Sequence, residues 1–308
     1  MRVLVTGALG FIGHHLCLHL AGEGFEVYGV DNLSRGRGER VELLGERGVE
    51  VEILDVRELG ALTEYMRKIK PDTVVHLAAL ISAEESFEKP LLYEEVNVRG
   101  TISVVLASNR AGVQRLVYAS SAAVYGEPRY LPVDEEHPTD PLSPYGATKL
   151  AGEHFSKTLF RGRTVILRIF NVYGPGQNPE YAGVIARFME RLSRGEPPVI
   201  YGDGGQTRDF IYVTDVVEAL RKALEVDVEE DVVVNVGTGK PVSINELAQM
   251  MIRIAGASVS PIHAPPRMGD IRHSYADISK AKSILNWRPR VKLEDGLKAL
   301  FKARLNKH

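Results

Sequence analysis

The fold of this chain is decided by the stretch Gly7-Ala8-Leu9-Gly10-Phe11-Ile12-Gly13. It follows the β-branched run from Arg2 to Val5 and opens an apolar segment of helix length, residues 11–23. Glycines between a strand and a helix permit a tight turn and let the backbone approach a pyrophosphate, which the helix N-terminus stabilises. The stretch therefore predicts a dinucleotide site at the start of an α/β domain.

An acidic residue stands where such a site contacts the ribose. Asp31 lies 18 residues beyond Gly13, at the end of a second predicted strand, residues 26–30. Its carboxylate can accept hydrogen bonds from an adenosine ribose diol, and its charge would repel the 2′-phosphate of NADP. We therefore expect NAD as the cofactor. NADP stays the alternative, because Arg35 and Arg37 follow closely.

Short apolar runs alternate with longer amphipathic segments through the first half of the chain. Continuous Val, Ile and Leu runs indicate strands covered on both faces, as in a parallel sheet. We expect an α/β fold: a doubly wound Rossmann sheet over residues 1–171 and a smaller mixed substrate lobe over 172–308, of which about 209–240 returns to the sheet. Further strands are expected at 50–54, 73–77, 115–119, 164–169 and 232–236, and helices at 58–69, 91–111, 145–160, 244–255 and 293–303.

The composition excludes several classes of protein. The 308 residues are 44% hydrophobic and 25% charged, with a net charge of −2, so we expect no nucleic-acid partner. The single cysteine, Cys17, cannot form an intramolecular disulfide, and we predict no metal site. No apolar run reaches the roughly 20 residues that a membrane span requires, and no signal peptide precedes the first strand. We expect a cytoplasmic protein without membrane contact.

A second set of residues indicates catalysis. Tyr145 and Lys149 are four residues apart, so on a helix they share one face. A phenol has a pKa of about 10, and a nearby ammonium or oxidised nicotinamide would lower it toward the working range of a base. Ser120-Ser121 follows a predicted strand, at the carboxyl end where α/β sheets place chemistry.

In this order, the motifs resemble the extended branch of the short-chain dehydrogenase/reductase superfamily, which contains the NAD-dependent epimerases and dehydratases. The resemblance runs from Arg2 to about Leu300 and is closest to UDP-galactose (UDP-glucose) 4-epimerases. It implies a catalytic triad of Ser121, Tyr145 and Lys149. It also implies cofactor contacts from Gly7, Gly10, Phe11, Ile12, Gly13, Asp31, Asn32, Asp55, Val56, Leu77, Ala78, Ala79, Asn97, Tyr145 and Lys149.

The same resemblance implies a UDP-sugar substrate bound by the second half of the chain. Tyr201 would lie beside the uracil, Arg208 and Arg267 would bind the phosphates, and Asp270 would bind the uridine ribose. Two guanidiniums suit a diphosphate, since each can bond phosphate oxygens in pairs. The remaining substrate contacts implied are Ser121, Asn171, Val184 and Ser274.

One absence narrows the reaction. Relatives that dehydrate nucleotide sugars carry Thr-Asp-Glu where this chain has Ser121-Ala122-Ala123, and decarboxylating relatives carry a glutamate nearby. Reversible oxidation at C4 is left, which describes an epimerase acting through a 4-keto sugar with tightly bound NAD. The alternatives are a UDP-glucuronate 4-epimerase, a dTDP- or GDP-sugar epimerase or reductase, and an inactive NAD-binding sensor.

Two finer expectations follow from the resemblance. Some of these epimerases carry a tyrosine where Ser274 stands, and a small residue leaves room for an N-acetyl group, so we hypothesise that UDP-GlcNAc and UDP-GalNAc are accepted as well. The family often dimerises through the helices expected at 91–111 and 145–160, and we expect a homodimer.

Overall fold

The computed structural model describes residues 1–178, 183–266 and 271–305, and its larger part is built on a seven-stranded parallel sheet. The strand order reverses direction between β1 and β4, which is the point where open α/β sheets bind ligands. This arrangement confirms the expected doubly wound fold. In spatial order the strands are β10 (Val232–Val236), β6 (Arg163–Ile169), β5 (Arg115–Ser121), β4 (Thr73–His76), β1 (Arg2–Thr6), β2 (Glu26–Asp31) and β3 (Glu50–Ile53).

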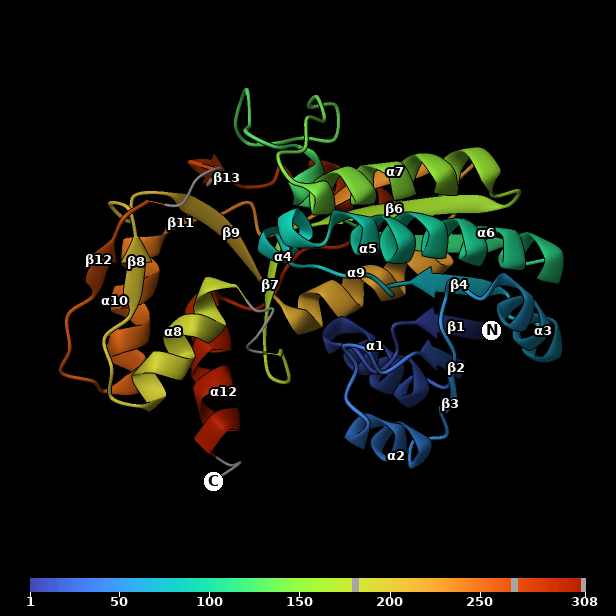
Figure 1. The fold of residues 1–308 in the computed structure, drawn as a ribbon, viewed down its shortest axis with the longest axis horizontal. Helices are drawn as coiled ribbons and strands as arrows, with labels where there is room; N and C mark the ends of the chain where they lie inside the picture. The colour runs from blue at the N-terminus through green and yellow to red at the C-terminus, as the bar shows by residue number, and fades with distance from the viewer. Residues whose placement is uncertain (179–182, 267–270, 306–308) are drawn as a thin grey trace.

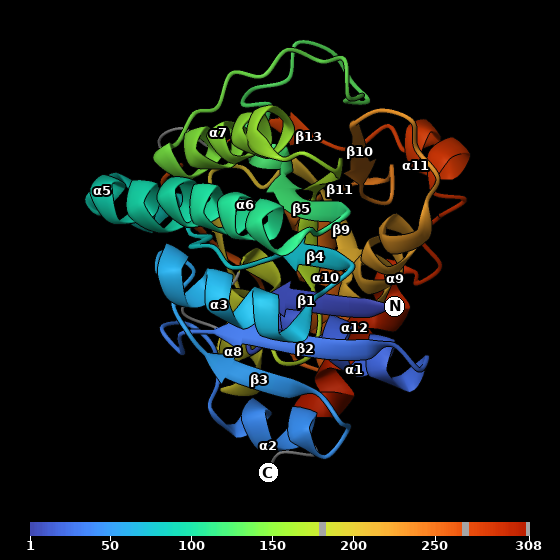
Figure 2. The same ribbon diagram turned by 90° about the vertical axis from the view of Figure 1, so that its right-hand side faces the viewer.

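Helices cover both faces of this sheet, as the continuous apolar runs require (Figure 2). In β1, Val3 and Val5 pack into the core on one face while Leu4 packs into the core on the other, and all three side chains are fully buried. One face carries α1 (Phe11–Gly22), α9 (Val213–Glu225) and α11 (Ser279–Ile284); the other carries α3 (Leu59–Ile69), α6 (Gly100–Ala111) and α7 (Pro144–Leu159). Short α2 (Glu39–Gly45) lies beside β3.

The helix expected over residues 91–111 is in fact three consecutive helical segments. A π-helix, η1 (Glu94–Arg99), separates α5 (Pro90–Tyr93) from α6, and α4 (Ala83–Glu88) precedes them. Exposed apolar side chains lie on this stretch, with Phe87 64% and Leu91 78% exposed. The homodimer contact expected here stays a prediction.

The smaller lobe has its own core. A four-stranded sheet is centred on β9 (Thr207–Tyr212), which pairs with β7 (Asn171–Tyr173), β11 (Pro241–Ser243) and β13 (His273–Ser274). A second sheet pairs β8 (Val199–Tyr201) with β12 (Ile262–Ala264), and the apolar faces of α8 (Val184–Ser193), α10 (Ile244–Ala255) and α12 (Leu293–Leu305) close the core. Figure 1 shows this lobe on the left, joined to the large sheet through β7 and β9. The expected domain boundaries stay a prediction.

No helix in the described part of the chain is long and apolar enough to cross a membrane.

Candidate functional site

A cleft with a volume of about 480 Å³ runs over the carboxyl ends of the strands, where the sheet order reverses. It is lined by the glycine loop, the ends of β2, β4 and β5, and the first turns of α7. A second cavity of about 240 Å³ lies in the smaller lobe. The two form one continuous site, because both are lined by Asn171, Val172, Gln177, Gly183 and Arg208.

The glycine loop closes tightly upon itself. Gly7 has a φ of +72°, and a Cβ placed on Gly13 would lie 2.0 Å from the carbonyl oxygen of Gly7. Helix α1 begins directly after Gly10 with no side-chain cap and no acidic residue in its first turn. Because the N-terminus of a helix carries a partial positive charge, this turn is suited to an anion such as a pyrophosphate.

Asp31 ends β2 beside that loop. Its carboxylate accepts hydrogen bonds from the backbone N–H of Leu9 (3.0 Å) and of Leu33 (2.8 Å). Burial raises the pKa of Asp31, and these two hydrogen bonds act in the opposite direction. A carboxylate can accept about four hydrogen bonds, so Asp31 retains capacity for the hydroxyls of a ribose.

The two arginines that made NADP an alternative also line the cleft, and each lies near an acidic residue. Nη2 of Arg35 donates to both carboxylate oxygens of Glu85, each at 2.7 Å. Nη1 of Arg37 lies 3.5 Å from a carboxylate oxygen of Glu39.

Two residues from the cofactor prediction do not line the cleft. The carboxylate of Asp55 is bound by Arg57 and by Nδ2 of Asn32 (2.8 Å), which lowers its pKa, while the adjacent Val56 faces the cleft. The side-chain amide of Asn97 accepts a hydrogen bond from the N–H of Leu80 (2.8 Å) and donates one to the C=O of Leu80 (2.9 Å). It therefore holds the loop after β4 without lining the cleft. All the other predicted cofactor residues line the cleft: Gly7, Gly10, Phe11, Ile12, Gly13, Asp31, Asn32, Val56, Leu77, Ala78, Ala79, Tyr145 and Lys149.

These features fit NAD. The uncapped N-terminus of α1 can bind the pyrophosphate, and the carboxylate of Asp31 can bind the adenosine ribose. The volume of the cleft is in the range of ligand sites.

The three residues of the expected triad meet in the same cleft. Ser121 ends β5, while Tyr145 and Lys149 lie on successive turns of α7, which begins at a Ser143 side-chain cap followed by Pro144. Oγ of Ser121 accepts a hydrogen bond from the N–H of Ala123 (3.2 Å), so its own O–H can be donated elsewhere. Nζ of Lys149 lies 4.5 Å from the centroid of the Tyr118 ring, a cation–π contact.

Burial governs the charges of this triad in the protein alone. The pKa of Tyr145 is raised because its phenol is desolvated, and a hydrogen bond with Ser121 partly opposes the rise. This direction is the opposite of the expected lowering, because desolvation of the phenol is the largest effect and outweighs the hydrogen bond with Ser121. Burial also lowers the pKa of Lys149 to about 7, so its ammonium can release a proton near neutral pH.

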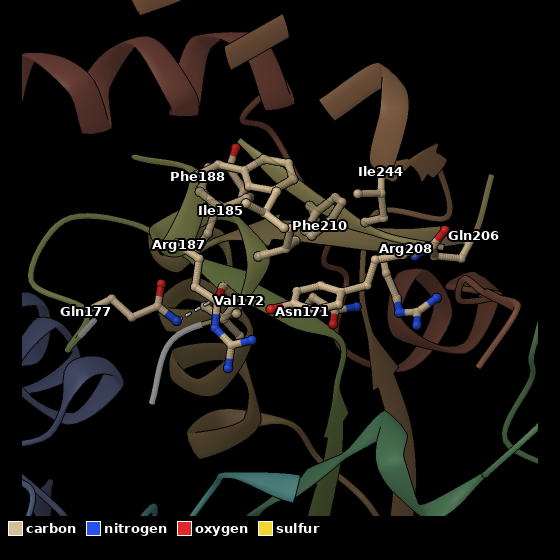
Figure 3. A pocket seen from close by; sticks show the side chains of 15 residues that line it. Asn171, Val172, Gln177, Ile185, Arg187, Phe188, Gln206, Arg208, Phe210 and Ile244 are labelled. Carbon is tan, nitrogen blue, oxygen red and sulfur yellow. Dashed lines mark hydrogen bonds between the residues drawn. The ribbon is translucent and has the colours of Figure 1, made fainter. Parts of the chain in front are cut away.

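The second cavity has an apolar side and a cationic side (Figure 3). Ile185, Phe188 and Phe210 gather on one side, and the guanidiniums of Arg187 and Arg208 lie on the other. Of the predicted substrate residues, Asn171, Val184, Tyr201 and Arg208 line this cavity, and Ser121, Asn171, Arg208 and Ser274 line the larger cleft. The predicted Arg267 and Asp270 lie outside the described residues.

Sequence reasoning missed several lining residues, of which Arg40 has the most distinctive contacts. This side chain is 5% exposed and bridges two backbone segments: Nη1 donates to the carbonyl of Leu9 (2.7 Å) and Nη2 to the carbonyl of Gly176 (2.6 Å). It therefore joins the glycine loop to the segment that leads into the smaller lobe. No motif marks it, because both acceptors are backbone atoms.

The sequence model of the NAD dependent epimerase/dehydratase family matches residues 3–237. The chain belongs to the NAD-dependent epimerase/dehydratase family. NAD is accordingly its cofactor, as the glycine loop and Asp31 predicted.

Similar sequences confirm the resemblance to UDP-glucose 4-epimerases that the motifs predicted. It is 40% identical to the UDP-glucose 4-epimerase of Mycolicibacterium smegmatis, over 96% of each chain. It is 34% identical to the UDP-glucuronate 4-epimerase of Thermodesulfobacterium geofontis, over 96% of this chain and 93% of the relative.

Solved structures agree with this placement. The UDP-glucose 4-epimerase of Thermotoga maritima, crystallised with UDP-glucose, superposes with a TM-score of 0.93 at 36% identity. The UDP-N-acetylglucosamine 4-epimerase of Methanobrevibacter ruminantium superposes with a TM-score of 0.92 at 34% identity. In both comparisons the match covers 100% of this chain and 99% of the other.

Proposed function

We propose that this family member is a UDP-hexose 4-epimerase that interconverts UDP-glucose and UDP-galactose. The observation that carries the proposal is the meeting of Ser121, Tyr145 and Lys149 in the cleft that holds the glycine loop, next to a cavity with two arginines. Oxidation of a nucleotide sugar requires an acid–base group, a cleft for the dinucleotide and an adjoining cationic cavity for the diphosphate.

In the proposed mechanism Tyr145 is the base. Its phenolate accepts the proton of the C4 hydroxyl, and Ser121 donates a hydrogen bond to the same oxygen. The ammonium of Lys149, one helical turn away, stabilises the phenolate. NAD bound in the cleft beside Tyr145 and Lys149 would supply the chemistry of reversible hydride transfer at C4. Tyr145 gives the proton back to the oxygen once the 4-keto sugar has turned over, so the protein ends each cycle unchanged.

The smaller lobe is proposed to hold the UDP moiety. Phe188 and Phe210 offer apolar surface to the uracil beside Tyr201, which is 37% exposed, and Arg208 stands where the two cavities meet. A guanidinium at that junction suits a diphosphate lying between base and sugar. Arg267 and Asp270 are proposed as further phosphate and ribose ligands from the resemblance alone.

Epimerisation is favoured over dehydration by the residues that follow Ser121. Ala122 and Ala123 line the cleft and carry no group that could transfer a proton, so elimination of water has no acid–base pair at this position. UDP-glucuronate stays a second candidate substrate, because a relative of that specificity is 34% identical.

The size of Ser274 supports a wider substrate range. This residue ends β13 and lines the larger cleft, so a hydroxymethyl group stands where a phenol would fill space. We propose that UDP-GlcNAc and UDP-GalNAc are substrates too. Ser274→Tyr should reduce turnover of the N-acetylated pair relative to the plain pair, whereas Ser283→Tyr, at an exposed position of α11, should not. Equal selectivity in all three proteins would contradict the idea.

The main test measures formation of UDP-glucose from UDP-galactose by a coupled assay, without added NAD. Tyr145→Phe should lower kcat by about 100-fold or more, the usual contribution of a positioned acid–base group. Tyr28→Phe is the matched control, because Tyr28 lies on β2 and its hydroxyl bonds the exposed Glu26. Absence of turnover by wild-type protein that carries bound NAD would favour a sensor, and an unaltered rate in Tyr145→Phe would contradict the mechanism.

A further inference from the structure

Helix α7 carries a buried carboxylate that the proposed mechanism does not use. Glu153 is 1% exposed and lies four residues after Lys149, one turn further along the same face. Removing a carboxylate from water costs several kcal/mol unless partners compensate. The contacts of Glu153 therefore have to account for a charge at this depth.

Glu153 is bound by two strands of the large sheet. Its Oε1 accepts hydrogen bonds from Oγ of Ser120 on β5 (2.5 Å) and from Nε of Arg168 on β6 (2.9 Å), and its Oε2 accepts from Nη2 of Arg168 (2.7 Å). Arg168 is 6% exposed and its guanidinium also stacks 4.8 Å from the centroid of the Tyr125 ring. One carboxylate thus joins α7, β5 and β6.

These three elements carry the groups that have to meet at the sugar. Tyr145 and Lys149 lie on α7, Ser121 directly follows Ser120 on β5, and Asn171 follows the end of β6. A buried ion pair contributes little to stability compared with well-packed apolar residues of the same volume. Packing alone therefore does not explain a charged pair at this position. Holding α7, β5 and β6 together and placing a negative charge near Lys149 would explain it.

We propose that Glu153 is a positioning residue for the reaction. Through Ser120 it holds the end of β5 against α7, so that Ser121 and Tyr145 face the same substrate oxygen, and its negative charge keeps the Lys149 ammonium protonated. This inference rests on the proposed function, because it assigns Lys149 the task of stabilising the Tyr145 phenolate.

Among the groups described around Lys149, Glu153 carries the negative charge that favours the protonated ammonium. The face of the Tyr118 ring on β5 and the phenol of Tyr145 on α7 are neutral, and His76 on β4, whose pKa burial lowers to about 3, is neutral as well. Arg168 on β6 is cationic and directs its guanidinium at Glu153. Burial lowers the pKa of Lys149 to about 7, and the charge of Glu153 is the effect that raises it.

The test is the pH dependence of kcat for UDP-galactose in wild type, Glu153→Gln and Ser120→Ala. Activity needs the Lys149 ammonium, so it is lost as pH rises through the pKa of that group. Glu153→Gln should lower kcat about tenfold and move the alkaline limb about one pH unit lower. Ser120→Ala removes the bond to β5 and keeps the charge, so it should lower kcat without moving the limb.

A second variant covers the case that Glu153→Gln leaves Arg168 unpaired and fails to fold. Glu153→Gln combined with Arg168→Met removes both charges together, and the alkaline limb should again move down. A limb at the wild-type position in either folded variant would overturn the proposal.

Titration of the Tyr145 phenolate by ultraviolet difference absorbance, each protein against its Tyr145→Phe counterpart, gives a readout independent of turnover. Loss of the Glu153 charge should move this midpoint upward, and an unmoved midpoint would overturn the proposal. If the midpoint moves although wild type does not turn over UDP-galactose, the charge coupling holds and the proposed function fails.

Discussion

Gly13 offers the sharpest test of the cofactor site. The substitution Gly13→Ala adds a single methyl group to the first turn of α1, at a position that faces the glycine loop. Its Cβ would lie 2.0 Å from the carbonyl oxygen of Gly7, 2.8 Å from the carbonyl carbon of Gly7 and 3.0 Å from Cα of Ala8. All three are backbone atoms, so no side chain can rotate away, and the loop itself has to retreat by more than about 1 Å to restore ordinary contact distances of about 3.5 Å.

The expected magnitudes follow from this displacement. Overpacking costs about 1–3 kcal/mol, and the better helix propensity of alanine returns up to about 1 kcal/mol. Nucleotide binding suffers more, because a displaced loop loses at least one hydrogen bond to a charged pyrophosphate, worth about 1.5–3 kcal/mol. The affinity for NAD should therefore fall at least about tenfold.

Gly22→Ala is the matched control. Gly22 is the last residue of the same helix, and a Cβ there meets nothing within 4 Å. It should leave NAD binding unchanged and stabilise the protein by up to about 1 kcal/mol. Calorimetric titration of nucleotide-stripped protein with NAD and urea denaturation measure the two quantities. Wild-type affinity in Gly13→Ala would refute the idea that the closed loop forms the pyrophosphate site.

Two further predictions concern retention of NAD and acid stability. Glu85→Gln removes the ion pair that Arg35 forms beside the cleft, in which the two side chains are only 26% (Arg35) and 14% (Glu85) exposed. The rate of NAD release, measured by stopped-flow exchange, should rise about tenfold. Glu88→Gln on the same helix is the control and should leave this rate unchanged. Burial lowers the pKa of His76 to about 3, so the unfolded chain binds more protons than the folded one between about pH 3 and 6.5, and stability falls as pH falls through that window. Between pH 6.5 and 5 the free energy of unfolding should fall by roughly 2 kcal/mol because of His76. His76→Gln should abolish this fall, as measured by denaturation curves at both pH values. An equal pH dependence of the unfolding free energy in both proteins would contradict the assignment.

The large sheet could be predicted because its signals are local. The inner strands carry short continuous apolar runs, such as Val3-Leu4-Val5 in β1 and Val165-Ile166-Leu167 in β6. The glycine loop between a strand and a helix, followed by Asp31 at the end of the next strand, indicated where the dinucleotide cleft lies. The limits of β10 and α10 matched the expected ranges, residues 232–236 and 244–255. The order of the triad along the chain likewise predicted that Ser121, Tyr145 and Lys149 would share one cleft.

The rest depends on contacts that no local pattern encodes. Helix α9 was not among the expected helices, although Val213, Val216, Val217 and Leu220 follow a helical period. The short strands around β9 exist only through pairing with distant partners, such as β13 from the end of the chain. The contacts of Asn97, Arg40 and Glu153 depend on which groups the fold brings beside them: backbone atoms for Asn97 and Arg40, and the side chains of Ser120 and Arg168 for Glu153.

The bridge made by Arg40 has a consequence for how this protein tolerates change. Its acceptors are the main-chain oxygens at positions 9 and 176, so the bonds do not depend on the identity of the side chains at those positions, and a substitution there needs no compensating change at Arg40. Covariation between sequences would therefore not reveal the link. A chimaera that joined the cofactor half of this chain to the substrate half of a relative would depend on this link, since Arg40 on α2 would have to reach the carbonyl oxygen that the other parent supplies at position 176.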